Sequence, residues 1–206
     1  MCAAACAALA ERGERVAAFK PAVTGLEDEA GEWAADHELL AAAASAGQAP
    51  EDVAPYRYGP AVSPHLAAER AGSPIDPAAM ARAARSAAAA AEAIFVEGVG
   101  GLLVPLTPDY LVRDLAIELG LPLLVVARPG LGTINHTLLT VESAHAAGLD
   151  VRAVVMTPWP ACAGWLEESN RATVERLSGV AVATLPPGSP RELGALGRHL
   201  PLDDWL

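Results

Sequence analysis

Short, continuous apolar runs rich in β-branched residues alternate along this chain with alanine-rich stretches. The runs do not alternate with polar residues, which is typical of strands buried on both faces of a parallel sheet. The repeated strand, helix, strand order predicts an α/β doubly wound fold, a mostly parallel sheet with helices on both faces. The candidate strands are residues 16–19, 93–96, 122–127, 152–156 and 180–184.

The alanine-rich stretches predict the helices, because alanine has the strongest helix propensity. The candidate helices are residues 2–12, 32–44, 77–91, 111–119, 133–147 and 166–177. The 206 residues contain no internal repeat and no obvious boundary, so we expect a single domain over residues 1–206. The proline-rich segments 47–64 and 186–190 are predicted to be loops.

The charge balance limits the partners. A formal net charge of -11 argues against nucleic acid and against an anionic membrane surface. It does not exclude a phosphate ligand, which helix N-termini and a few local cations can bind. No apolar stretch is long enough to span a bilayer, and the first ten residues lack the basic region of a signal peptide.

The cysteines are few and odd in number, which is typical of a reduced, cytoplasmic protein. Cys2 and Cys6 lie one helical turn apart, and a metal site there would need two further ligands nearby. We therefore expect both to be small buried residues on a helix.

Polar residues follow several predicted strands, and ligands of such sheets bind outside the carboxyl ends of the strands. Lys20 follows the first strand and is suited to phosphate or carboxylate groups, although a solvated lysine fits the position equally well. Glu97 follows the second strand and precedes glycines, which favours a carboxylate for Mg²⁺ over a solvated turn. Asp36 taken alone is typical of a solvated helix face.

Three further strand ends carry glycine or proline. After the third strand, glycines lead into the helix that begins near Thr133, a residue that could cap it beside an anion. After the fourth and fifth strands, residues 157–160 and 185–188 form rigid loops that could be the walls of a base pocket.

Taken together and in this order, these segments resemble the dethiobiotin synthetase family from about Met1 to the C-terminus. The combination is specific, whereas any one segment alone is weak. The matching segments are Lys-Pro-x-x-Thr-Gly at 20–25, Asp36, Ser-Pro-His-Leu-Ala-Ala at 63–68, Glu-Gly-x-Gly-Gly at 97–101, Gly-Leu-Gly-Thr-Ile-Asn-His at 130–136, Asn170 with Val-Glu-Arg-Leu at 174–177, and Ala-Thr-Leu-Pro at 183–186.

The resemblance implies a P-loop NTPase-like domain that forms a homodimer. It also implies that CO₂ (or bicarbonate), ATP and 7,8-diaminopelargonate react to give dethiobiotin, ADP and phosphate. In that case Lys20 would contact the carbamate and the transferring phosphoryl group, and Asp36 and Glu97 would bind Mg²⁺. The implied substrate-binding residues are Thr24, Gly132, Thr133 and Asn135, the last three acting across the dimer. The implied nucleotide-binding residues are Asp36, Glu97, Gly98, Val99, Gly100, Thr157 (where the family more commonly has Asn), Pro158, Pro186, Pro187 and Gly188.

One part of the family pattern is absent from these 206 residues. The family begins with a strand, a Gly-x-x-x-x-Gly-Lys-Thr phosphate-binding loop and a helix, but no Gly-Lys-Ser/Thr sequence occurs here, and Lys20 is the only lysine. Residues 2–12 resemble the helix that follows the loop. We expect that the recorded start lies too far downstream; a cut polypeptide and a pseudoenzyme are the alternatives. Without an inner strand, the chain is expected to be poorly soluble or unstable.

Two other functions stay open. The chain could be another P-loop amidoligase or ParA-like enzyme, although it is too short to include a glutaminase domain. It could also be a non-catalytic homologue that serves in binding or dimerisation. The absent loop supports the second alternative, and the presence of Lys20, Asp36 and Glu97 opposes it.

Overall fold

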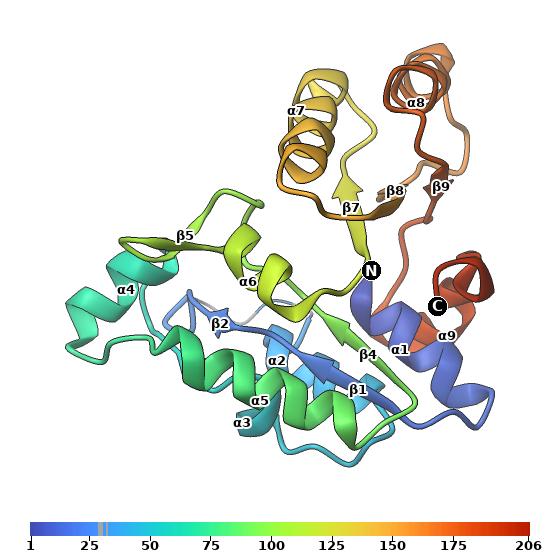
Figure 1. Ribbon diagram of the computed structural model, residues 1–206. Coiled ribbons are helices and arrows are strands. Elements are labelled where there is room, and N and C mark those ends of the chain that lie inside the picture. Colours follow the sequence, from blue (N-terminus) through green and yellow to red (C-terminus); the bar gives the residue numbers. More distant parts are fainter. Residues whose placement is uncertain (29–30, 32) are drawn as a thin grey trace.

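The computed structural model describes residues 1–28, 31 and 33–206, and within them the strands form four small sheets (Figure 1). In parallel pairs, β1 (Val16–Phe19) lies beside β4 (Ala93–Val96), and β2 (Ala22–Val23) beside β3 (Tyr56–Arg57). The antiparallel pair is β5 (Pro105–Thr107) and β6 (Tyr110–Leu111). The largest sheet is parallel, with the order β7 (Leu123–Ala127), β8 (Val151–Met156) and β9 (Val182–Thr184).

The helices connect these strands and cover both faces of the sheets. They are α1 (Cys2–Glu11), α2 (Asp36–Ala43), α3 (Pro50–Val53), α4 (Pro64–Ala71), α5 (Pro77–Ala89), α6 (Val112–Leu119), α7 (Thr133–Ala146), α8 (Trp165–Ser178) and α9 (Leu193–Gly197), with 3₁₀ turns at Pro190–Glu192 and Leu202–Asp204. None of the helices in the described part of the chain is long and apolar enough to cross a membrane.

Successive residues of the strands are buried on opposite sides. Ala18 of β1 and Phe95 of β4 pack with α1 and α2, in a cluster that also contains Val155 of β8. Phe19 packs on the other face against α4, α5 and α6, and Met156 packs against α7 and α8. Helix α1 therefore packs against both main sheets, the β1–β4 pair and the β7–β8–β9 sheet. This confirms the prediction of a mostly parallel sheet whose strands are covered on both faces.

Several strand edges have no strand partner among the described residues, including one edge of β4 and one of β7. β4 pairs with β1 on one side only, and β7 pairs with β8 on one side only. The two sheets are joined through the shared core under α1 rather than through a backbone ladder. An edge of this kind presents unpaired N–H and C=O groups to which a further parallel strand could hydrogen-bond.

The prediction of one long loop over residues 47–64 is wrong. This segment contains α3 and β3, and α4 begins at Pro64. Pro50 and Pro64 each stand at the first position of a helix, where proline is well tolerated because the missing N–H has no helical partner. β3 forms only because Tyr56 and Arg57 pair with the distant Ala22 and Val23. The predicted helix 32–44 is observed from Asp36, and Glu32 lies outside the described residues.

The C-terminal segment packs against α1 (Figure 1). Helices α9 and α1 approach so closely that a Cβ atom on Gly197 of α9 would overlap the carbonyl oxygen of Ala4 of α1. Beyond α9, Leu202 and Trp205 are buried in the same cluster as α1. This segment, for which the sequence predicted neither structure nor role, therefore forms part of the core.

Candidate functional site

A lysine and two carboxylates meet where β1 and β4 end. Phe19 and Val96 are register partners, so Lys20 and Glu97 leave the sheet side by side, and the Glu97 N–H donates to the Phe19 carbonyl at 2.8 Å. The Lys20 Nζ lies 2.7 Å from Glu97 Oε1 and 2.8 Å from Asp36 Oδ2. Asp36 reaches the cluster from the first residue of α2. The structure therefore brings together three residues predicted for the site.

The Lys20 side chain is 7% exposed, whereas Glu97 is 28% and Asp36 is 55% exposed. Burial alone would lower the pKa of Lys20. The negative charges of Glu97 and Asp36 and the hydrogen bonds to both outweigh burial and raise the pKa above its ordinary value of 10.5. Lys20 is thus a cation at neutral pH, fixed at the bottom of an acidic site that is open on the side of Asp36.

The donor atoms of this cluster fit Mg²⁺. This ion prefers oxygen ligands, usually binds through one or two carboxylates, and retains several waters. Asp36 and Glu97 place carboxylate oxygens around a single Nζ, and the exposure of Asp36 leaves room for water and phosphate oxygens. These two residues could therefore hold the ion.

The start of α1 lies beside the same cluster. Burial raises the pKa of the Cys2 thiol well above its ordinary value, and the negative charge of Glu97 raises it further. One turn later, burial and then Glu97 raise the pKa of Cys6 to about 12. Both side chains are buried, as predicted, and the sequence did not indicate that Cys2 would lie near Glu97.

The cysteines should differ sharply in reactivity, because the thiolate is the reactive form and only Cys162 is exposed. Brief treatment of the folded chain with iodoacetamide at pH 8 is expected to modify Cys162 alone, as read by peptide mass spectrometry. After unfolding in guanidinium, all three should react. Modification of Cys2 or Cys6 in the folded chain at the rate of Cys162 would contradict the packing of α1.

Residues 98–100 continue from Glu97 as a turn, in which Gly98 and Gly100 are exposed and Val99 is half-buried. The exposed backbone of this turn is accessible to a ligand. Thr24 follows β2 and is half-buried. These residues therefore lie at strand ends, as predicted, and Gly98 to Gly100 directly adjoin Glu97.

The loops after β8 and β9 lie together at the carboxyl end of the other sheet. The Thr157 N–H donates to the carbonyl of Ala127 at 2.9 Å, and the Trp159 N–H donates to the carbonyl of Leu185 at 2.8 Å. Thr157 and Pro158 therefore adjoin the segment that continues into Pro186, Pro187 and Gly188. The peptide bond between Thr157 and Pro158 is cis. No hydrogen bond or ion pair among the described residues joins these loops to the Lys20 cluster.

The helix α7 begins after Gly132, whose φ of 91° is favoured by glycine. Thr133 is the first helical residue and is not the cap. Its buried hydroxyl lies 3.2 Å from that of Thr137 instead. Asn135 is exposed and lines a hollow of about 500 Å³. Asn170 of α8, which only the resemblance had singled out, lines the same hollow.

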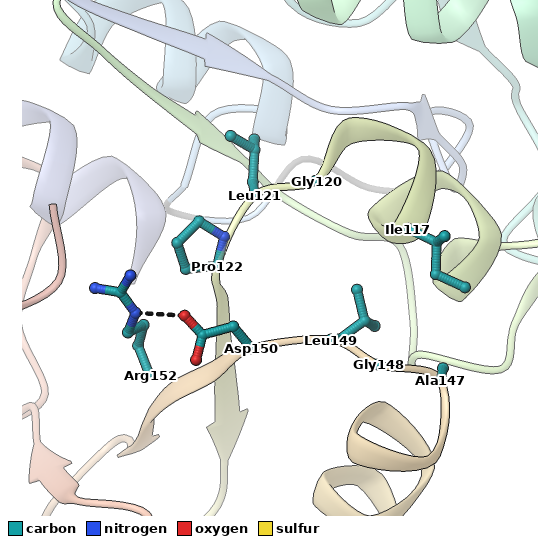
Figure 2. Close-up of a pocket in the computed structure, with 9 residues that line it drawn as sticks. All are labelled: Ile117, Gly120, Leu121, Pro122, Ala147, Gly148, Leu149, Asp150 and Arg152. Carbon is teal, nitrogen blue, oxygen red and sulfur yellow. Dashed lines mark hydrogen bonds and ion pairs between the residues drawn. The ribbon is translucent and has the colours of Figure 1, made fainter.

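Figure 2 shows a second hollow, of about 280 Å³, in which Arg152 Nε lies 2.6 Å from Asp150 Oδ2. The residues that line it, such as Pro122 and Leu149, stand at the amino ends of β7 and β8. It is therefore at the opposite end of these strands from the predicted site residues, and its charged groups already pair with each other.

Comparisons with known proteins identify the family. A family model described as an AAA domain matches residues 1–190. An ATP-dependent dethiobiotin synthetase from Bacillus cereus is 37% identical over 177 residues, which are 86% of this chain and 72% of that protein. The chain belongs to the dethiobiotin synthetase family.

Other members of the dethiobiotin synthetase family are similar over a shorter stretch. The protein from Bacillus thuringiensis (strain Al Hakam) is 42% identical over 137 residues, 66% of this chain and 57% of that protein. The protein from Anaeromyxobacter sp. (strain Fw109-5) is 44% identical over 138 residues, 67% of this chain and 60% of that protein. The chain therefore spans less than two thirds of the length of these two relatives.

Solved structures confirm the predicted P-loop NTPase-like fold of this dethiobiotin synthetase family member. The MinC:MinD cell division protein complex from Aquifex aeolicus matches with a TM-score of 0.50 and 13% identity, over 98% of this chain and 81% of that one. A ParA family ATPase from Chlorobium tepidum matches with a TM-score of 0.52 and 15% identity, over 96% of this chain and 84% of that one. At these identities the similarity concerns the fold alone.

Proposed function

We propose that this chain acts as a dethiobiotin synthetase, closing the ureido ring of dethiobiotin from 7,8-diaminopelargonate, CO₂ and ATP. An amine of the substrate adds to CO₂ and loses a proton, which gives a carbamate. The γ-phosphoryl group of ATP is transferred to the carbamate oxygen, and the second amine then attacks the carbonyl carbon and expels phosphate. The observation that carries this proposal is the contact of Lys20 with both Glu97 and Asp36, in a chain of this family.

Each group of the cluster has a role that its chemistry supports. The ammonium of Lys20 would contact the carbamate and the transferring phosphoryl group, where it neutralises negative charge as oxygen–phosphorus bonds form and break. Asp36 and Glu97 would hold Mg²⁺, which supplies further positive charge to the phosphates when bound. The Thr24 hydroxyl would bind the substrate. Phosphoryl transfer depends mainly on positioning and charge neutralisation, so this set supplies part of what the reaction requires.

The nucleotide would lie along the carboxyl ends of both main sheets. The exposed backbone from Gly98 to Gly100 adjoins Glu97, which suits contact with phosphate or ribose groups. The adenine would lie between Thr157 with Pro158 and the loop from Pro186 to Gly188, since these two loops are adjacent. Asp36 and Glu97 would complete the nucleotide site through Mg²⁺.

A homodimer is the second part of the proposal, and the exposed face of α7 supports it. Leu131 is 93% exposed and Leu139 is 56% exposed, and they line the hollow of about 500 Å³. Apolar side chains gathered in this way are typical of an interaction surface. Gly132, Thr133 and Asn135 would there bind the carboxylate of the substrate across the dimer.

Light scattering tests the dimer over a concentration range of about 100-fold. The mass of a single 21.1 kDa chain at every concentration in this range would contradict it.

The test is ADP release with ATP, Mg²⁺, bicarbonate and 7,8-diaminopelargonate, together with detection of dethiobiotin by mass spectrometry. The 206-residue chain is compared with a version extended through the upstream in-frame codons, because no Gly-Lys-Ser/Thr sequence occurs in these residues. Turnover that requires all four reactants, in either version, supports the proposal. If both versions fold and bind ATP without any turnover, the non-catalytic homologue becomes the better account.

A further inference from the structure

Asn170 has a buried side-chain amide that is hydrogen-bonded to a loop far from it in the sequence. The residue lies on α8 and is 5% exposed. Its Nδ2 lies 2.8 Å from the carbonyl oxygen of Pro129 and 3.3 Å from that of Gly130. An amide nitrogen carries two hydrogens, so a single side chain can donate to both carbonyls.

The loop that Asn170 contacts leads directly into α7. Besides accepting from Asn170, the Gly130 carbonyl accepts from the Thr133 N–H at 3.2 Å. Gly132 then starts α7, and no side chain caps this helix end. The orientation of the segment 129–132 is therefore set by its own turn and by the amide of Asn170.

The same side chain lines the hollow beside α7. Its walls combine the polar residues Asn135 and Asn170 and the acidic Glu142 with apolar residues such as Ile134 and Leu138. A hollow of this kind suits a ligand with an aliphatic chain and a polar end. Asn170 thus both lines the hollow and donates hydrogen bonds to the loop that leads into α7.

We propose that Asn170 is a positioning residue, which fixes the carbonyls of Pro129 and Gly130 so that residues 132–135 are arranged to bind the substrate's aliphatic carboxylate. This inference rests on the proposed function, because it concerns the substrate assigned there to Gly132, Thr133 and Asn135. Without the amide, the Pro129 carbonyl loses the Asn170 donor and the Gly130 carbonyl retains the Thr133 N–H, so the loop would turn toward water to regain the lost hydrogen bonds.

Two variants test this. Asn170→Ala removes the donor, and Asn170→Asp keeps the shape but replaces the amide with an acceptor that repels both carbonyl oxygens. Ser178→Ala is the matched control at the other end of the same helix. It removes the hydrogen bond that the Ser178 hydroxyl donates to the Val174 carbonyl, at 2.7 Å, and the one it accepts from the Val180 N–H, at 3.1 Å. The readouts are hydrogen–deuterium exchange of residues 129–137, calorimetric binding of 7,8-diaminopelargonate and of Mg²⁺-ATP, and the melting temperature.

For Asn170→Ala we expect about tenfold faster exchange in residues 129–137 and about tenfold weaker binding of 7,8-diaminopelargonate, with ATP binding unchanged. Asn170→Asp should weaken substrate binding more, and Ser178→Ala should change neither property. Equal losses for both ligands, or the same losses in Ser178→Ala, would reduce Asn170 to a structural residue and overturn the inference.

The failures of the two proposals can be told apart. If the unmodified chain binds 7,8-diaminopelargonate and Asn170→Ala binds it equally tightly, the inference is overturned and the proposed function stands. If neither the 206-residue chain nor its extended version binds this substrate, the proposed function fails, and the inference fails with it.

Discussion

Replacing Lys20 with methionine is expected to lower ADP formation by about a thousandfold, in whichever version of the protein turns over. Methionine has nearly the length of lysine but no charge. Lys20 is the only lysine of the chain, and its Nζ is the cation that contacts both Glu97 and Asp36. In the proposed mechanism, its loss would leave the carbamate and the transferring phosphoryl group without this positive charge. Initial rates at saturating ATP and substrate measure the effect.

The fold should tolerate this change, because the two carboxylates are partly exposed and water can replace the ammonium. We expect the melting temperature of Lys20→Met to fall by only a few degrees. Arg85→Met is the control: it removes an exposed cation that pairs with Glu118 at 3.4 Å, and it should keep the rate within twofold. If Lys20→Met retains more than a tenth of the rate, Lys20 does not act on the reacting groups.

Lys20→Arg is expected to restore little of the rate. Guanidinium is a planar fork with five donors, whereas this site surrounds a compact ammonium that is 7% exposed. If the Lys20→Arg variant reacts at nearly the rate of the unmodified protein, a positive charge is sufficient and its exact position does not matter.

Replacing Gly197 with alanine is expected to destabilise the chain by about 2–3 kcal/mol, the usual cost of overpacking a well-packed site. The added Cβ would overlap the backbone carbonyl oxygen of Ala4, which cannot move without α1. The two helices must therefore separate, and Leu202 and Trp205 would lose contact with the cluster under α1. Since 1 kcal/mol corresponds to roughly 2–4 °C for a chain of this size, the melting temperature should fall by about 4–12 °C.

Gly194→Ala is the matched control, since it makes the same change in the same helix. The three atoms nearest to its Cβ would all belong to the end of the Glu11 side chain, which can rotate away at the cost of an exposed ion pair with Arg198. Alanine also favours the helix over glycine. We expect its melting temperature to stay within about 2 °C of the unmodified chain. Alkylation of Cys6 should become faster in Gly197→Ala only, and equal stability of the two variants would contradict the close packing of α9 on α1.

The sequence by itself determined the main strands and two of the three residues of the candidate cluster. The apolar runs at residues 16–19 and 93–96 coincide with β1 and β4, because a strand buried on both faces must be apolar throughout. Lys20 and Glu97 could be predicted as site residues for a related reason. Each is the first polar residue after such a run, and parallel strands end at the same edge of a sheet.

Other features depended on contacts between segments that are distant in the sequence, and only the tertiary structure decided them. Asp36 follows no strand, so its place beside Lys20 could be expected only from family resemblance. β3 exists because Tyr56 and Arg57 pair with β2, a partner more than thirty residues away. Asn170 carries no local signal that its amide bonds to a loop about forty residues earlier. Local periodicity specifies helices and strands, whereas such pairings depend on how the whole chain packs.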